Sequence, residues 1–119
     1  MANAARVFFW GPPIPGREQK ALQHFNDVTQ FYAKKKEKGE IESYEAIFFD
    51  HFSSELDGIL IVRADSDKLD KIFQSDESVN FRHRAELLLS NYKVAMGIVG
   101  EGIKEGLASY AKQVAELLK

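Results

Sequence analysis

Four short segments of the chain combine β-branched and aromatic residues in the way that is typical of β-strands. They span residues 6–10, 41–52, 59–62 and 92–99. Because successive residues of a strand point to opposite sides of a sheet, each segment presents apolar side chains on both faces. The segment 59–62 is aliphatic throughout, which predicts a central strand buried on both sides. A sheet made from these strands therefore needs a cover on each of its faces.

Helical segments lie between and after these strands. Residues 17–38 carry apolar side chains three and four positions apart, and Gly39 suits the end of a helix. A second helical region runs from about residue 67 to 90, with an interruption at 75–78. The stretch 103–119 has the clearest apolar stripe in the chain. The order of elements is therefore β-α-β-β-α-β-α.

This order predicts an α+β fold of the ferredoxin-like type. In that fold, two β-α-β units with right-handed crossovers form a four-stranded antiparallel sheet with helices on one face. A length of 119 residues fits one domain. We expect that single domain over residues 1–119, with its core at 6–100 and an extra C-terminal helix at 103–119.

The two crossover helices cover only one face of the predicted sheet. Either the C-terminal helix folds over the open face, or a second copy of the chain packs sheet against sheet. In its element order and two-faced strands, over about residues 6–100, the chain resembles the dimeric α/β-barrel superfamily. The resemblance implies a homodimer in which the open faces pair and the C-terminal helix lies at the edge or is exchanged onto the partner. Proteins of this layout include small monooxygenases, isomerases and dehydratases, so the fold leaves the activity open.

The composition excludes several classes of function. The chain has no cysteine, which excludes disulfides, thiolate metal sites and thiol catalysis. Its three histidines, His24, His51 and His83, lie on separate predicted elements without the spacing of a metal site, so we predict no metal. We also expect no cofactor. A net charge of -2 and a third strand whose only cation is Arg63 argue against nucleic-acid binding.

The hydropathy of the chain bears on its location. No apolar run approaches the roughly 20 residues that a membrane-spanning helix needs, so we expect no membrane partner. Residues 1–6 lack the basic start and the long apolar core of a secretion signal. A cytoplasmic location is the default expectation.

The end of the second predicted strand holds the first candidate site. His51 shares a strand face with Glu45 and, across a simple hairpin, with Arg63. These groups in an apolar sheet surface suit a pocket for a small anionic or carbonyl ligand, which Arg63 would hold. His51 is then the candidate catalytic acid or base, because imidazole exchanges protons near neutral pH. The alternative is that His51 lies in water at the hairpin mouth and that Arg63 makes an ion pair at the surface or an interface.

Three further residues are candidates for ligand binding. His24 lies beside the apolar face of the first helix, which places a polar group between helix and sheet. Trp10 stands at the exit of the first strand, before the rigid loop 11–16, and Tyr44 lies near the start of the second strand. Aromatic residues in such places occur at pocket mouths and equally as plugs of a barrel end. The alternative for His24 is a partly buried residue that is hydrogen-bonded within the core.

The second helical region has two apolar sides. Val79, His83 and Leu87 lie nearly opposite the stripe that faces the sheet. This second side predicts a contact either with the C-terminal helix or with a partner chain, and we assign His83 to an interface.

We therefore expect a small-molecule-binding protein or a cofactor-independent enzyme, of proton-transfer or monooxygenase-like type, with a pocket in each half of a homodimer. The alternative is a non-catalytic structural or regulatory homodimer whose second sheet face exists only to make the interface. A polar cavity enclosed by that second face favours the first hypothesis, and a second face filled solidly by apolar side chains favours the alternative.

Overall fold

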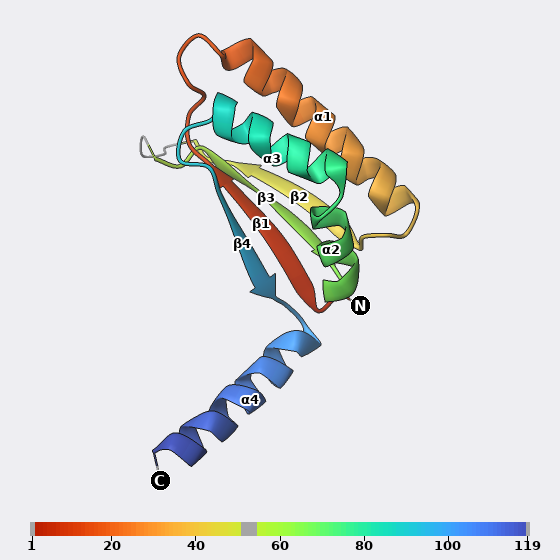
Figure 1. Ribbon diagram of the computed structural model, residues 1–119, viewed down its shortest axis with the longest axis vertical. Coiled ribbons are helices and arrows are strands. Elements are labelled where there is room, and N and C mark those ends of the chain that lie inside the picture. Colours follow the sequence, from red (N-terminus) through yellow and green to blue (C-terminus); the bar gives the residue numbers. More distant parts are fainter. Residues whose placement is uncertain (1, 51–54, 119) are drawn as a thin grey trace.

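A computed structural model describes residues 2–50 and 55–118, and that part of the chain contains four strands and four helices (Figure 1). The elements are β1 (Ala4–Trp10), α1 (Glu18–Glu37), β2 (Ser43–Phe48), β3 (Gly58–Ala64), α2 (Ser66–Phe73), α3 (Asp76–Leu88), β4 (Lys93–Ile98) and α4 (Glu101–Leu117). This order agrees with the prediction, and the interrupted helical region consists of the two helices α2 and α3. Strand β2 is shorter than predicted, and residues 51 and 52 of the predicted strand lie outside the described residues.

The strands form one antiparallel sheet in the order β2-β3-β1-β4. In its centre, Phe8 of β1 lies opposite Leu60 of β3 and Val94 of β4. On the other side of β3, Val62 lies opposite Tyr44 of β2. The helices α1, α2 and α3 cover one face of this sheet (Figure 1). The chain therefore has the ferredoxin-like α+β fold that the order of elements predicts.

The core lies between this helix layer and the sheet. The even-numbered residues of β1 and β3 are buried on that side, and Val62 is wholly shielded from solvent. The helices contribute Phe31 and Tyr32 from α1 and Leu69 and Ile72 from α2. Burial of these apolar side chains is the main stabilising contribution to the layer.

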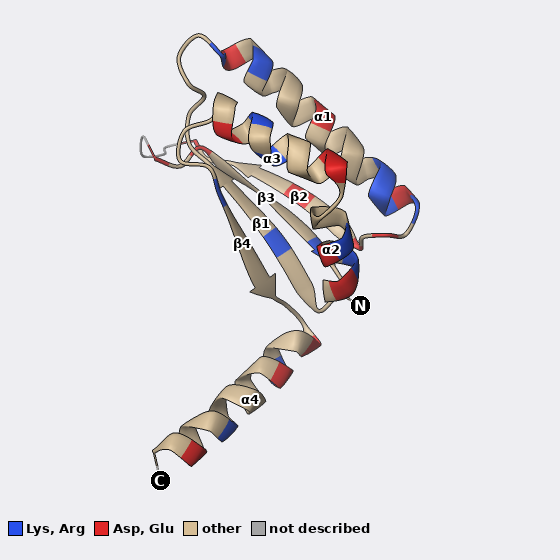
Figure 2. Ribbon diagram, in the orientation of Figure 1, with Lys and Arg blue, Asp and Glu red and all other residues tan. Residues whose placement is uncertain are grey.

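One charged side chain lies within this core. Arg6 of β1 is only 4% exposed, and its guanidinium forms an ion pair with Asp70 of α2. The same guanidinium lies 5.1 Å from the centre of the Phe73 ring. Most other charged residues lie on the helices, and few lie on the strands (Figure 2). Because a buried charge is costly to leave unpaired, the ion pair ties α2 to β1.

The opposite face of the sheet carries the odd-numbered residues of β1 and β3. Its half-buried apolar side chains are those of Val7, Phe9, Ile59 and Ile61. No helix of the described chain packs over them. The prediction that the strands have two apolar faces is therefore confirmed. The expectation that β3 is buried on both sides is not met within one chain, because the helices cover a single face.

Helix α4 does not cover the open face. It leaves the end of β4 and projects away from the other helices (Figure 1), and none of its residues is buried. Within the described residues, its contacts are chiefly with β4. The sequence allowed two places for α4 within its own chain, over the open face or against the second helical region. The structure shows α4 in neither place.

The start of β3 is a point of close packing. Gly58 lies opposite Trp10 of β1 and Phe48 of β2. A Cβ atom at Gly58 would lie 2.8 Å from the carbonyl oxygen of Ile47 and 2.8 Å from the indole ring of Trp10. The absence of a side chain at this position therefore allows the indole to lie against the backbone of β3.

We expect Gly58→Ala to displace the indole and to lower the free energy of unfolding by about 1–3 kcal/mol, since a methyl group has no room there. Trp10 is the only tryptophan, so its fluorescence spectrum reports the displacement and urea unfolding reports the stability. Gly97→Ala is the matched control, because the atoms nearest to its Cβ lie 3.9 Å away. Equal stability of the two variants would contradict this packing.

Candidate functional site

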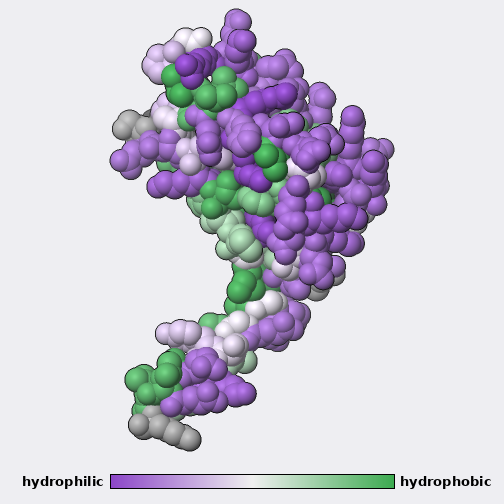
Figure 3. Space-filling view, in the orientation of Figure 1, coloured by the Kyte–Doolittle hydropathy of each residue, from purple (hydrophilic) through white to green (hydrophobic). Residues whose placement is uncertain are grey.

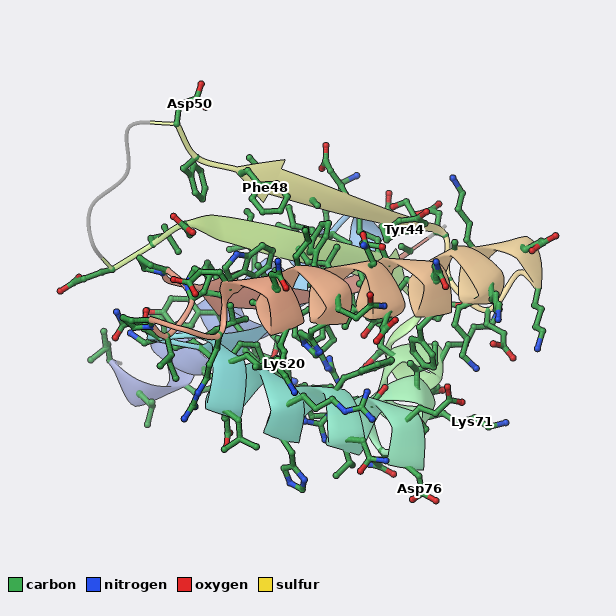
Figure 4. The ribbon with its side chains drawn as sticks, turned by 90° about the horizontal axis from the view of Figure 1, so that it is seen from above. Lys20, Tyr44, Phe48, Asp50, Lys71 and Asp76 are labelled. Carbon is green, nitrogen blue, oxygen red and sulfur yellow. The ribbon has the colours of Figure 1, made fainter. Side chains whose placement is uncertain are left out.

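A cavity of about 290 Å³ lies between the helix layer and the covered face of the sheet. Its lining residues come from β1, β2, β3, α1 and α3 and from the loops that precede α1, β3 and β4. In Figure 4, which looks down on the molecule, α1 lies between α3 and strand β2, where Tyr44 and Phe48 are labelled. The apolar lining includes Phe8, Trp10, Ala21, Phe25, Val28, Leu60, Phe81 and Leu89.

Three aromatic rings form one end of the cavity. The Trp10 ring centre lies 6.1 Å from that of Phe25 and 5.8 Å from that of Phe48. The Phe25 and Phe48 rings meet edge to face at 5.0 Å, a favourable geometry for aromatic pairs. Leu22 and Phe48 in the lining are 64% and 60% exposed, so the cavity opens to solvent beside them.

Two polar atoms of the lining residues are buried and have no hydrogen-bond partner among residues 2–50 and 55–118. They are Nδ1 of His24 and Oγ of Ser78, in residues that are 8% and 5% exposed. A buried polar atom without a partner costs about 1–3 kcal/mol, and such atoms are uncommon in folded proteins. A polar group of a bound molecule, or a water molecule, would satisfy them.

Local structure holds both residues in place. Ser78 lies in the first turn of α3, and its backbone N–H donates a hydrogen bond of 3.3 Å to Oγ of Ser75, the N-cap residue. The His24 imidazole meets the Phe81 ring edge to face, with 5.8 Å between the ring centres. This contact joins α1 to α3 at the cavity wall.

The environment of His24 favours the neutral imidazole. Burial lowers its pKa below the usual value of 6.5, and the charge of Arg84 lowers the pKa further. The charge of Asp27 opposes these effects. An uncharged imidazole both donates and accepts hydrogen bonds and can take up a proton from a bound acid.

Two tyrosines of the lining are held in their neutral form. Burial raises the pKa of Tyr32, and neighbouring Tyr92 raises it further. Burial also raises the pKa of Tyr92, to about 12, against the opposing charge of Arg82. Both phenols therefore remain protonated at neutral pH.

Arg82 of α3 supplies a fixed cation to the lining. Its Nη1 donates a hydrogen bond of 2.8 Å to the carbonyl oxygen of Phe73, and its guanidinium carbon lies 3.6 Å from the centre of the Phe73 ring. Glu18 and Asp57 are lining residues as well. The cavity is thus lined largely by apolar residues, with a few charged residues of both signs among them.

Two of the residues predicted to bind a ligand line this cavity. They are Trp10 at its aromatic end and His24 in its helical wall. Tyr44 is half-buried on the same face of the sheet and packs against the core, but it is not part of the lining.

The other predicted site belongs to the opposite face of the sheet. Arg63 lies on the open face, where its Nη1 is 3.7 Å from Oε1 of Glu45. Such an ion pair, at the surface or at an interface, was the alternative to a ligand-binding role for Arg63 that the sequence allowed. The cavity is on the helix-covered face, so Arg63 and His24 do not share a pocket. His51, the predicted catalytic residue, lies outside the described residues.

Sequence reasoning missed Ser78, Arg82 and Tyr92 as lining residues. The stretch 75–78 was interpreted only as an interruption between helical segments. A serine followed directly by two acidic residues, as at positions 75–77, is also a helix-start pattern, and it puts Ser78 in the first turn of a helix. The position of that turn in the cavity wall depends on the packing of α3 beside α1, which the helix-start pattern does not give.

Residues 2–50 and 55–118 hold no group of three or more histidine, aspartate or glutamate side chains placed to bind a metal ion. No helix of the described chain has the length and hydropathy needed to cross a membrane.

The chain is similar in structure to several solved proteins. A protein from Pseudomonas aeruginosa aligns with a TM-score of 0.61 and 16% identity, over 84% of this chain and 96% of that one. A conserved protein from Methanosarcina mazei aligns with a TM-score of 0.61 and 16% identity, over 80% and 91% of the two chains. A protein from Bacteroides fragilis, described as dimeric, of unknown function and of ferredoxin-like fold, aligns with a TM-score of 0.57 and 10% identity, over 81% and 96%. These likenesses show the fold alone. No protein-family model and no curated protein matches the sequence.

The lowered pKa of His24 predicts how stability depends on pH. Below pH 6.5 the histidine of the unfolded chain binds a proton while the folded one stays neutral, so the free energy of unfolding falls as the pH is lowered. We expect His24→Gln to flatten this dependence in urea unfolding measured between about pH 5 and 7.5. His83→Gln, which removes an exposed histidine from α3, is the control. An unchanged slope in His24→Gln would show that the imidazole is not held neutral.

Proposed function

We propose that this chain binds a small organic molecule in the cavity between its helix layer and its sheet. The observation that carries the proposal is the pair of unpartnered polar atoms, His24 Nδ1 and Ser78 Oγ, buried in residues that line an apolar cavity. Ligand sites are commonly apolar hollows with a few polar groups that orient the bound molecule. The volume of about 290 Å³ lies at the lower end of the range for such sites.

The chemistry of the wall defines the class of ligand. Flat aromatic side chains suit a planar apolar body, and the neutral imidazole and the serine hydroxyl suit one hydroxyl or carbonyl group on that body. The opening beside Leu22 and Phe48 is itself apolar, which favours the entry of such a molecule.

We propose further that two copies pair through the open faces of their sheets. The support is the uncovered apolar surface formed by β1 and β3, because so much exposed apolar area is unusual in a monomer. Each half of the homodimer then has its own cavity, on the side of the sheet away from the partner. The catalytic role of His51 and the ligand-binding role of Arg63 stay predictions.

Catalysis by proton transfer is the second candidate function. It is favoured by the neutral state of His24, which makes Nδ1 a proton acceptor for a bound hydroxyl or enol. Exchange of carbon-bound hydrogens of the ligand for deuterium in heavy water, lost in His24→Gln, would identify such a reaction, because hydroxyl hydrogens exchange without a catalyst.

The cavity can be tested by filling it. We expect wild-type protein to bind 1-naphthol, a planar arene with one hydroxyl group, and Ala21→Leu to bind it at least about tenfold more weakly because leucine occupies the cavity. Ala33→Leu is the matched control, since Ala33 lies on the same helix and is not among the lining residues. Isothermal titration of the three proteins measures the affinities.

The polar groups are tested by comparing 1-naphthol with naphthalene. A hydrogen bond to the hydroxyl group is expected to favour naphthol by about tenfold, and the double variant His24→Leu/Ser78→Ala should abolish that preference. The variant retains the helix cap, because Ser75 supplies it. Equal naphthol affinity in wild type and Ala21→Leu would overturn the proposed site.

A further inference from the structure

Helix α4 carries a regular apolar stripe that its own chain leaves exposed. The stripe consists of Ile103, Leu107, Tyr110, Val114 and Leu117. These residues are four, three, four and three positions apart, which is the spacing of a helix that packs along its length on another surface. Their exposed fractions run from 37% at Val114 to 79% at Leu117. Figure 3 shows apolar surface along one side of α4 and hydrophilic surface along the other.

The junction with β4 keeps the stripe away from the rest of its own chain. The turn uses Gly100 at a positive φ of 58°, a conformation that favours glycine. A Cβ atom at Gly102 would lie only 2.5 Å from the carbonyl oxygen of Asn3 and 2.7 Å from the Ile98 side chain. The Asn3 carbonyl also accepts a hydrogen bond of 3.1 Å from the N–H of Val99. The first turn of α4 is therefore closely packed, and this packing sets the direction of the helix.

We propose that the stripe of α4 packs on a second copy of this chain, as an arm that each protomer extends onto the other. This proposal rests on the pairing of the open sheet faces proposed above. One chain presents two uncovered apolar surfaces, the open sheet face and the stripe. A two-fold axis lets each protomer supply both surfaces to the other, so that a single partner covers both. A stable interface buries about 800 Å² on each partner, and the arm adds area to that of the sheet.

The charges of α4 argue for a protein partner over a lipid surface. The helix has two lysines against three glutamates, a net charge of -1, whereas helices that lie on membranes are typically rich in lysine and arginine on their polar side. Glu105 and Lys112 lie on the side opposite the stripe, where they stay in water when the stripe is buried.

The test compares two lysine substitutions on the same helix. Leu107→Lys puts a charge in the stripe, and Glu105→Lys puts the same side chain on the opposite side. Sedimentation over a wide range of concentration is expected to show a dimer that is weakened by about tenfold or more in Leu107→Lys and unchanged in Glu105→Lys. Leu107 is 62% exposed, so the fold of each protomer should persist, and circular dichroism checks this.

The outcomes distinguish the exchange of α4 from the pairing of the open sheet faces. Equal dimer affinity of the two variants would overturn the exchange of α4 and leave the sheet pairing intact. A wild-type monomer at high concentration would overturn both, and binding of naphthol would still test the cavity.

Alkylation of an introduced cysteine measures the burial of the α4 stripe directly. The chain has no cysteine, so a thiol introduced by Leu107→Cys or Lys112→Cys is the only one present. In the dimer, alkylation by iodoacetamide is expected to be slower for Leu107→Cys than for Lys112→Cys, and the difference should disappear on dilution to monomer. Equal rates at high concentration would contradict the proposal, and protection that appears only with phospholipid vesicles would replace the protein partner with a lipid surface.

Discussion

The packing of aromatic side chains between α1 and β1 is the interaction on which the rest of this structure depends. Trp10 meets Phe25, and Phe8 meets Tyr32, so the two elements touch through large rings. Gly58 makes room for the indole on the sheet side. The cavity lies beside these rings, between the helix layer and the sheet. The same aromatic contacts therefore stabilise the helix layer and form part of the wall of the proposed site.

The cavity and the uncovered apolar surface lie on opposite faces of the sheet. One face of the sheet holds the core and the cavity, and the other has no cover within the described chain. An interface on the open face would leave the cavity mouth beside Leu22 and Phe48 free. Binding and association are therefore compatible in this fold, and changes on one face need not alter the other.

The fold was predictable because it depends on local patterns. Alternation along the strands and three- and four-residue spacing along the helices predict the order of elements, and the positive φ of Gly39 agrees with the predicted end of α1. The extended direction of α4 was not predictable from its stripe. It depends on close contacts of Gly102 with Asn3 and Ile98, residues whose proximity appears only once β1 and β4 are paired.

The lining of the cavity was predictable in part. His24 and Trp10, which were predicted to bind a ligand, are lining residues, and each was selected because it lies at the edge of an apolar pattern, where a polar or aromatic group meets the core. Ser78 and Arg82 were missed, since their place in the wall depends on how α3 packs beside α1. Arg63 was predicted to line a pocket, although it lies on the open face. Alternation along a strand shows which residues share a face, but it does not show which face the helices cover.

Native mass spectrometry of the purified protein, after incubation with a metabolite extract of its host cells, tests whether the cavity binds a small molecule. We expect wild-type protein and Ala33→Leu to retain a small molecule and Ala21→Leu to lack it, because only that last variant fills the cavity. Ligand binding in the cavity would be ruled out if wild-type protein retained no molecule, or if Ala21→Leu retained the same molecule as wild type.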